Sequence, residues 1–281
     1  MQRILAQGID NPVLVDKYMM GTELEVDVIS DGTDVLIPGI MEHIERAGVH
    51  SGDSIAVYPP YNLNDMMTEK IVDSSRKLAL ALGTKGLVNI QYLIWENELY
   101  VIEVNPRASR TVPYISKVTG VPMCDLATKV SLGMKLTDLG YGTGLYPTSP
   151  YTAVKVPVFS FEKLTDVDTQ LGPEMKSTGE VLGIGNNLEE ALYKGLIASG
   201  SKMNKKGGVF ITVRDGDKKE IGEIAKKFDK MGFPLYATTG TASVLAKLGL
   251  TVKIVDKIHE SPVNTITLLE SGKLAYIIST S

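Results

Sequence analysis

The segment 87–105 constrains the fold of this chain most, because it alternates apolar and polar residues on both sides of a short polar turn. Two strands are expected, residues 87–95 and 99–105, joined at residues 96–98. Successive side chains of a strand point to opposite faces, so one face of this hairpin is almost wholly apolar and should face the core. The residues on that face are Val88, Ile90, Tyr92, Ile94, Tyr100, Ile102 and Val104.

The register of the hairpin decides which polar side chains meet on its other face. We predict a three-residue loop with Asn97 near the left-handed region, because a two-residue loop would set Gln91 against Ile102 on the wrong face. The pairs that follow are Trp95 with Leu99, Gln91 with Glu103 and Asn89 with Asn105. Four oxygen-bearing side chains would then gather at the end of the hairpin away from the turn.

This polar cluster has two interpretations. Outward-facing polar residues are ordinary for a solvated antiparallel sheet face. Here, however, they are segregated from the apolar residues of the same face, and Arg107 and Arg110 follow directly after Asn105. Carboxylate and amide oxygens suit Mg²⁺, which commonly shares its coordination with nucleotide phosphates, and arginines suit oxyanions. The cluster is therefore a candidate metal and phosphoryl-transfer site.

Composition excludes several other classes of protein. The single cysteine, Cys124, rules out a disulfide framework and a four-cysteine zinc site, and we expect it to be a core thiol. A formal net charge of −4 argues against a nucleic-acid binder. No apolar run approaches the ~18 residues of a membrane span, and residues 1–8 do not read as a signal peptide. The sequence predicts a cytoplasmic protein that acts on or binds small molecules.

The chain divides into three parts of different pattern. We predict a β-rich domain at 1–135 and an alternating strand–helix domain at 204–281. Between them, residues 136–203 form a connector that is rich in Pro, Gly and Thr and contains one helix. Strand–helix–strand alternation of this length predicts right-handed crossovers and a parallel sheet, so the fold class is α/β. An apolar strand at 13–15 begins almost at once, and another ends the chain, so both ends look cut.

Three long segments carry a family resemblance. Residues 102–113 (Ile-Glu-Val-Asn-Pro-Arg-Ala-Ser-Arg-Thr-Val-Pro), 39–54 and 171–181 resemble signatures of the large chain of carbamoyl phosphate synthetase. The resemblance runs from about residue 12 to 281. It implies the latter part of the second ATP-grasp unit, with an antiparallel sheet. A truncated, Rossmann-like regulatory domain similar to methylglyoxal synthase follows.

The resemblance implies an ATP site that uses Mg²⁺ or Mn²⁺ to phosphorylate carbamate. Its metal ligands would be Gln91, Glu103 and Asn105, with Gln91 and Glu103 also at the nucleotide, while Arg107 and Arg110 would stabilise the transferring phosphoryl group and the carbamate. The implied nucleotide-binding residues are Lys17, Met19, Glu23, Gly48, Val49, His50 and Ser51. For His50, a loop histidine with a local hydrogen bond is the alternative.

The resemblance also implies an effector site in the last domain. The run Ala-Thr-Thr-Gly-Thr at 237–241 lies at a strand-to-helix junction, where free backbone N–H groups bind anions; a plain helix cap is the alternative. The implied residues for a nucleotide effector are Lys218, Thr238, Thr241, Lys257, Ser279 and Ser281. Glu45 and Asp53 match contacts to an ornithine activator, while Val156 stands where a third contact is acidic.

Two functions from different classes follow. The first is a component of a glutamine-hydrolysing ligase, with a glutamine amidotransferase small subunit as partner. The second is a non-catalytic piece that binds an effector and contacts further copies of the chain, because the lobe covering the phosphates is expected before Met1. On this reasoning the isolated chain should not turn over ATP. A biotin-carboxylase-like enzyme is a third option, but it would not explain the residues 238–241.

Overall fold

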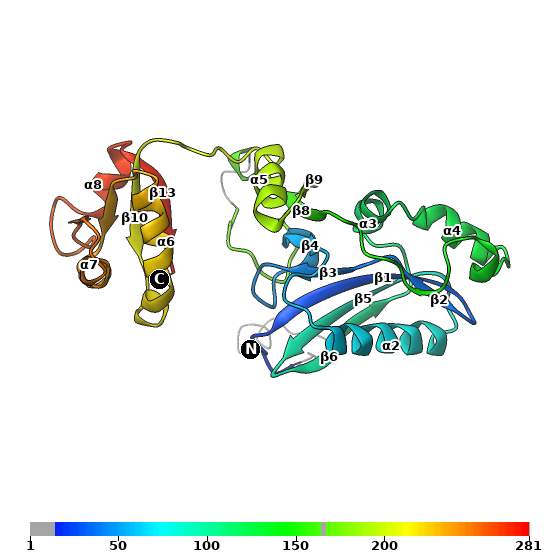
Figure 1. The fold of residues 1–281 in the computed structure, drawn as a ribbon. Coiled ribbons are helices and arrows are strands. Elements are labelled where there is room, and N and C mark those ends of the chain that lie inside the picture. Colours follow the sequence, from blue (N-terminus) through cyan, green and yellow to red (C-terminus); the bar gives the residue numbers. More distant parts are fainter. Residues whose placement is uncertain (1–14, 164–166, 281) are drawn as a thin grey trace. The chain divides into compact units, whose positions relative to one another are not determined.

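The computed structural model describes residues 15–163 and 167–280, and these form two compact units, 1–201 and 202–281, which are treated separately below (Figure 1). The strand predicted at 13–15 falls almost wholly outside the described residues. Within the described part of the chain, no helix is both long and apolar enough to cross a bilayer.

Unit 1 is built on a nine-stranded, mostly antiparallel sheet in the order β6-β5-β1-β3-β4-β8-β9, with β2 beside β1 and β7 parallel to β2. Its strands are β1 Thr22–Asp31, β2 Val35–Ile37, β3 Ile40–His43, β4 Ala56–Tyr58, β5 Lys85–Trp95, β6 Glu98–Asn105, β7 Gly144–Leu145, β8 Thr152–Val158 and β9 Gly179–Gly185. Its helices are α2 Asp65–Ala81, α3 Val112–Thr119, α4 Met123–Ser131 and α5 Leu188–Ala198, with short 3₁₀ turns η1 Ser51–Asp53, η2 Leu136–Asp138 and η3 Phe161–Lys163.

Helices cover the sheet around β1 from both sides (Figure 1). On one side, Met67 and Ile71 of α2 pack against Leu24, Val26 and Val28 of β1. On the other, α3 and α4 form a second core with Ile29 of β1. With layers on both sides, nine of the ten residues of β1 are buried.

The hairpin corrects one prediction and keeps its consequence. The turn has two residues, Glu96 and Asn97, both at positive φ, so Trp95 pairs with Glu98 and the predicted three-residue loop is wrong. A bulge between Gln91 and Tyr92 then shifts the register by one residue. The pairs at the far end are therefore Gln91 with Glu103 and Asn89 with Asn105, as expected from the sequence.

The bulge also changes which residues of β6 face the core. Before the bulge, Leu99 lies opposite Ile94 and packs on the core, whereas Tyr100 and Ile102 are 37% and 48% exposed. The sequence placed these last two on the core side. Val104, beyond the bulge, packs on the core as expected.

The segment 136–203, set apart in the sequence as a connector, carries more structure than one helix. Its helix α5 matches the expected position, and β8 and β9 extend the sheet of unit 1, with α5 packed on them through Ala191. Cys124, expected in the core, lies exposed on α4, so that prediction is wrong. Its helix presents Met123, Leu126 and Val130 to the core instead.

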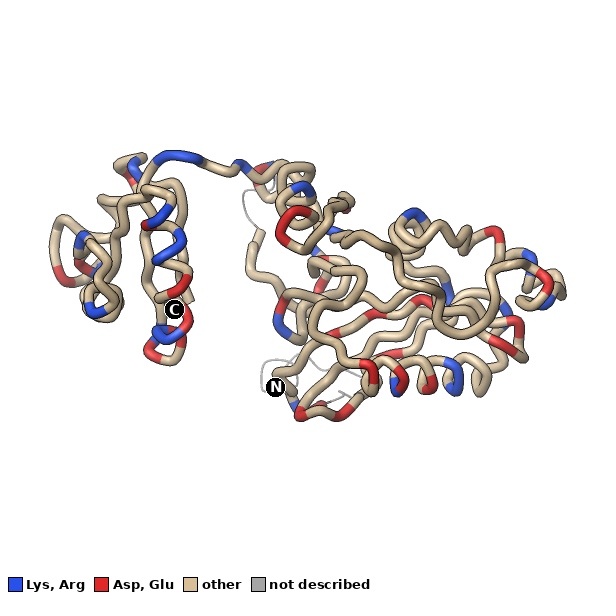
Figure 2. Tube along the Cα trace, viewed as in Figure 1, with Lys and Arg blue, Asp and Glu red and all other residues tan. Residues whose placement is uncertain are grey.

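Unit 2 has a parallel sheet of four strands in the order β12-β11-β10-β13. The strands are β10 Gly208–Thr212, β11 Leu235–Ala237, β12 Val252–Ile254 and β13 Leu274–Ser279, and the helices are η4 Asp215–Asp217, α6 Lys218–Lys230, α7 Thr239–Lys247 and α8 Thr265–Glu270. These elements follow the predicted strand–helix order. The inner face of α6 is centred on Ile221 and Ala225. Charged residues of both signs are interspersed along the rest of this helix (Figure 2).

Candidate functional site

Three carboxylates of β1 form the floor of the candidate site. The strand reads Glu-Leu-Glu-Val-Asp-Val from residue 23, so its alternation sends the aliphatic side chains toward α2 and Glu23, Glu25 and Asp27 to the opposite face. Their residues are only 8%, 3% and 1% exposed. Of these three residues, only Glu23 was predicted from the sequence. The alternation of carboxylate and aliphatic residues is the signal that could have identified Glu25 and Asp27.

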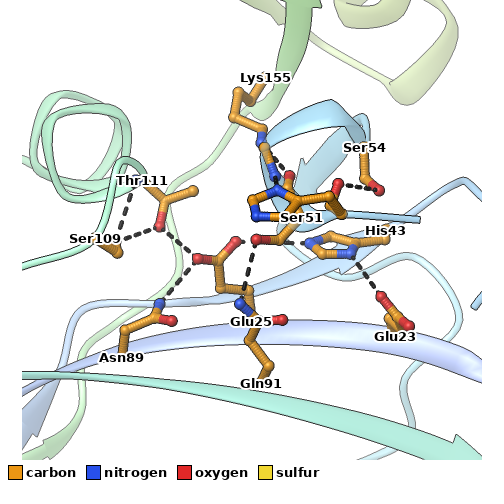
Figure 3. A network of polar contacts seen from close by, with 12 residues as sticks. Glu23, Glu25, His43, Ser51, Ser54, Asn89, Gln91, Ser109, Thr111 and Lys155 are labelled. Atoms are coloured by element: carbon orange, nitrogen blue, oxygen red, sulfur yellow. Dashed lines mark hydrogen bonds and ion pairs between the residues drawn. The ribbon is translucent and has the colours of Figure 1, made fainter. Parts of the chain in front are cut away.

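His43, from β3, lies between two of these carboxylates (Figure 3). Its Nδ1 is 3.6 Å from Glu23 Oε2, and its Nε2 is 3.6 Å from Glu25 Oε2. Burial lowers the pKa of His43, but Glu23 and Glu25 outweigh it and the pKa is raised overall. For the carboxyl of Glu25, burial acts in the opposite direction and raises the pKa. His43 and Lys155 outweigh burial and lower this pKa to about 2. The cluster thus favours a charged His43 beside an ionised Glu25.

Asp27 is the anchor of a second set of contacts. Asn89 Nδ2 donates to Asp27 Oδ1 at 2.9 Å and to Glu25 Oε1 at 2.8 Å. The hydroxyls of Ser109 and Thr111 donate to Asp27 Oδ2 at 2.8 Å and 2.6 Å. Burial and the nearby Glu25 raise the pKa of Asp27 to about 6. Ser109 and Thr111 flank Arg110, so this buried carboxylate fixes the end of the segment 106–111 that connects β6 to α3.

The predicted metal ligands are brought together. Gln91 and Glu103 face each other across β5 and β6, and Asn105 Nδ2 donates to Glu103 Oε1 at 2.9 Å. Gln91 Nε2 donates to Ser51 Oγ at 3.2 Å. Both amides thus use their nitrogen on protein partners, and an amide oxygen is of the type that could ligate a cation. Among the described residues, no group of three or more His, Cys, Asp or Glu side chains is placed to hold a metal ion.

The loop 48–51 closes one wall of the site. Glu23 Oε1 accepts from the backbone N–H of Gly48 at 2.8 Å, and Val49 is buried. His50 Nδ1 accepts from the Gly52 backbone N–H at 3.0 Å, which is the local hydrogen bond considered as its alternative role. The fully buried ammonium of Lys155 donates to the Ser51 carbonyl at 2.8 Å. Lys155 was not singled out from the sequence, because an alternating strand gives no sign that a lysine turns inward.

A small cavity of about 80 Å³ joins these groups. Its wall includes Gln91, Glu103, His50, Ser51, Arg107, Arg110 and Lys155. Both arginines are exposed; Arg107 donates to the carbonyl of Ala108, and Arg110 contacts the sulfur of Met175. Six residues implied at the site are not among the lining residues: Lys17, Met19, Glu23, Gly48, Val49 and Asn105. Lys17 Nζ lies 4.1 Å from the centre of the Trp95 ring.

The two acidic residues tied to an ornithine contact have internal partners. Glu45 Oε2 accepts from the Ile55 backbone N–H at 2.6 Å, and burial raises the pKa of its carboxyl. Asp53 is fully buried and accepts from the backbone N–H groups of Lys176 and Ser177, each at 2.8 Å. These contacts hold η1 against the segment before β9.

In unit 2, a cavity of about 730 Å³ opens at the amino-terminal end of α7. Five of the residues implied for an effector line it: Lys218, Thr238, Thr241, Lys257 and Ser279. Ser281 lies outside the described residues. Thr238 is the N-cap without a side-chain cap bond, and its hydroxyl lies 3.3 Å from that of Thr212. Residues far apart in sequence therefore meet here because parallel strands end at one edge of the sheet.

The fold and the oxygen-rich site of unit 1 define the ATP-grasp class of nucleotide-binding proteins, and sequence comparison bears this out. Residues 4–139 match the ATP-binding domain of the carbamoyl-phosphate synthase L chain, and residues 220–281 match the MGS-like domain. Carbamoyl phosphate synthase large chains of two Clostridium perfringens strains are each 55% identical over 271 residues. The chain belongs to this family of large chains.

The extent of the similarity differs between the compared proteins. The matched residues are 96% of this chain and 25% of each clostridial protein, so it spans about a quarter of their length. Among solved structures, a biotin carboxylase domain of a single-chain bacterial carboxylase is 19% identical with a TM-score of 0.45, over 53% of this chain and 34% of that chain. The K. lactis urea amidolyase is 15% identical with a TM-score of 0.49, over 62% of this chain and 12% of that chain.

Proposed function

We propose that unit 1 supplies the metal ligands and the arginines with which a longer enzyme phosphorylates carbamate from ATP, giving carbamoyl phosphate. The observation that carries the proposal is the register that sets Gln91 opposite Glu103, with Asn105 hydrogen-bonded to Glu103. Arg107, Arg110 and Lys155 line the same cavity. Oxygen ligands beside three cations suit a reaction in which phosphate and carboxylate charges meet.

Each group of the site has a part that follows from its chemistry. Gln91, Glu103 and Asn105 would hold Mg²⁺ or Mn²⁺, which supplies charge neutralisation at the nucleotide phosphates. Arg107 and Arg110 would stabilise the charge on the transferring phosphoryl group and on carbamate. Asp27 keeps Ser109 and Thr111 in place on either side of Arg110. The protein thus contributes positioning and electrostatics.

A chimera tests this function. This sequence would replace the matching quarter of the Clostridium perfringens large chain, and ATP formation from carbamoyl phosphate and ADP would be measured. We expect an active chimera, and loss of about 100-fold or more with Glu103→Gln or Arg110→Met, as for other groups that stabilise transferring charge. Glu98→Gln, at the exposed turn of the same hairpin, is the matched control. A folded chimera in which Glu103→Gln keeps full activity would refute the assignment.

Unit 2 has a separate proposed role as a binding site for a phosphate-bearing nucleotide effector. Lys218 and Lys257 line one cavity with the first turn of α7, whose N–H groups have no partner within the helix. Calorimetry with uridine 5′-monophosphate and inosine 5′-monophosphate tests this directly. Thr241→Ala and Lys257→Ala should each weaken binding, and unchanged affinity in both variants would contradict the site.

A non-catalytic role is the alternative for the chain taken alone, as an effector-binding and oligomer-contact piece. Measuring the isolated 281-residue chain beside the chimera distinguishes the two. We expect the isolated chain to form no ATP above background, while its unit 2 still binds the effector nucleotide. A cytoplasmic location and pairing with a glutamine amidotransferase small subunit complete the proposal, and co-purification of the chimera with the clostridial small subunit tests the latter.

A further inference from the structure

An aspartate of the chain already holds one of the two lysines of the effector cavity. Lys218 Nζ donates to Asp215 Oδ1 at 2.5 Å, and both residues line the cavity. The side chain of Asp215 is 95% exposed, whereas that of Lys218 is 22% exposed. Lys257, on the same wall, has no ion-pair partner within 4 Å among the described residues. Lys257 nevertheless lies near enough to Asp215 to help lower the pKa of that carboxyl, so the two lysines differ in direct pairing with Asp215.

The position of Lys218 explains why it has an anionic partner. A methyl group built on Gly240 would lie 3.1 Å from Lys218 Nζ, so the ammonium lies against the first turn of α7. That end of a helix carries a partial positive charge from its free N–H groups. An ammonium beside it is unfavourable unless an anion is near both, and Asp215 is the carboxylate that the chain provides.

We infer that Asp215 is a built-in competitor for the phosphate of the effector: it pairs with Lys218 in the empty cavity and releases it when phosphate arrives. This inference rests on the role proposed for unit 2. Because Asp215 is exposed at one end of η4, its carboxylate can turn into solvent without breaking other contacts. The resident ion pair then sets the affinity, since part of the binding free energy goes into separating Asp215 from Lys218.

The test is binding of uridine 5′-monophosphate, inosine 5′-monophosphate and inorganic phosphate to the whole chain, by calorimetry. Asp215→Asn should tighten phosphate-bearing probes by about 1.5- to 5-fold, the range in which an exposed ion pair competes. Glu223→Gln is the matched control, because it removes one negative charge from the same unit at a carboxylate that pairs with Lys226, and neither of these two residues lines the cavity. This control should leave the affinity unchanged. Uridine and inosine lack the phosphate, so their affinities should be the same for the unchanged chain and for both variants.

A double-mutant cycle shows whether the effect passes through Lys218. In a Lys218→Met background, Asp215→Asn should tighten the monophosphates clearly less than it does in the unchanged chain, and the remaining effect reflects the charge of Asp215 near Lys257. Equal tightening by Asp215→Asn and Glu223→Gln would overturn the inference. Weaker binding in Asp215→Asn would also overturn it, because Asp215 would then be a positioning residue. If neither the unchanged chain nor Asp215→Asn binds any probe, the proposed effector role fails as well, so the two failures are distinguishable.

Discussion

Asp27 makes unit 1 less stable as the pH rises, and Asp27→Asn should remove that dependence. Its carboxyl is fully buried beside Glu25, and its pKa is raised from 3.8 to about 6 in the folded protein. The folded state therefore holds this proton more tightly than the unfolded state. The free energy of unfolding falls as the pH rises from about 4 to about 6, and the stabilising effect of the proton is fully present below about pH 4.

The size of the effect follows from the shift. A difference of about two pKa units corresponds to about 3 kcal/mol at pH 7, at 1.36 kcal/mol per unit. The pKa of Glu25 is lowered to about 2, so this neighbour stays ionised throughout the window and continues to repel an ionised Asp27. Relative to the unchanged chain, Asp27→Asn should therefore gain about 3 kcal/mol of stability between pH 4 and pH 7, whatever its offset at pH 4.

Urea unfolding at several pH values between 4 and 7 measures this difference. Trp95 is the single tryptophan and lies on β5, so its fluorescence reports unit 1 alone. Asp125→Asn is the control, because Asp125 is exposed on α4 and pairs with Lys129. If the stabilities of Asp27→Asn and the unchanged chain run parallel from pH 4 to pH 7, the assignment of a buried, proton-retaining Asp27 is refuted.

Three further predictions follow from local geometry, each measured by urea unfolding followed at Trp95. Changing the turn pair Glu96-Asn97 to Asn-Gly should stabilise unit 1 by about 0.5–1 kcal/mol, because both residues have positive φ; a loss of stability would contradict the two-residue turn. Tyr92→Phe should cost about 1–3 kcal/mol, since it leaves the buried Ser75 hydroxyl without its 2.8 Å partner, and the double change with Ser75→Ala should recover part of this loss. Gly183→Ala should destabilise by more than 2 kcal/mol, because its Cβ would lie 2.1 Å from a backbone oxygen of α5, whereas Gly172→Ala meets nothing within 4 Å and should be neutral.

Local pattern predicted much of the fold. In unit 2 the alternation of apolar runs and helical faces marked each strand and helix, because each element there is short and ends at its own glycine or polar turn. The same reasoning placed α5. It failed for Cys124, since one position on a short amphipathic helix can fall on either side of the apolar stripe.

The sequence by itself determined which side chains the hairpin could bring together, because period-two alternation leaves only one face for Gln91, Glu103 and Asn105. Only the tertiary structure decided how that register arises. A two-residue turn followed by a bulge with one extra residue in β6 gives the same pairs at the far end as a three-residue turn without a bulge. It also decided that the carboxylates of β1 are buried, and that His43 and Lys155 reach them from β3 and β8. Charges from separate strands stabilise one another only once the sheet has formed, and no local pattern reports that.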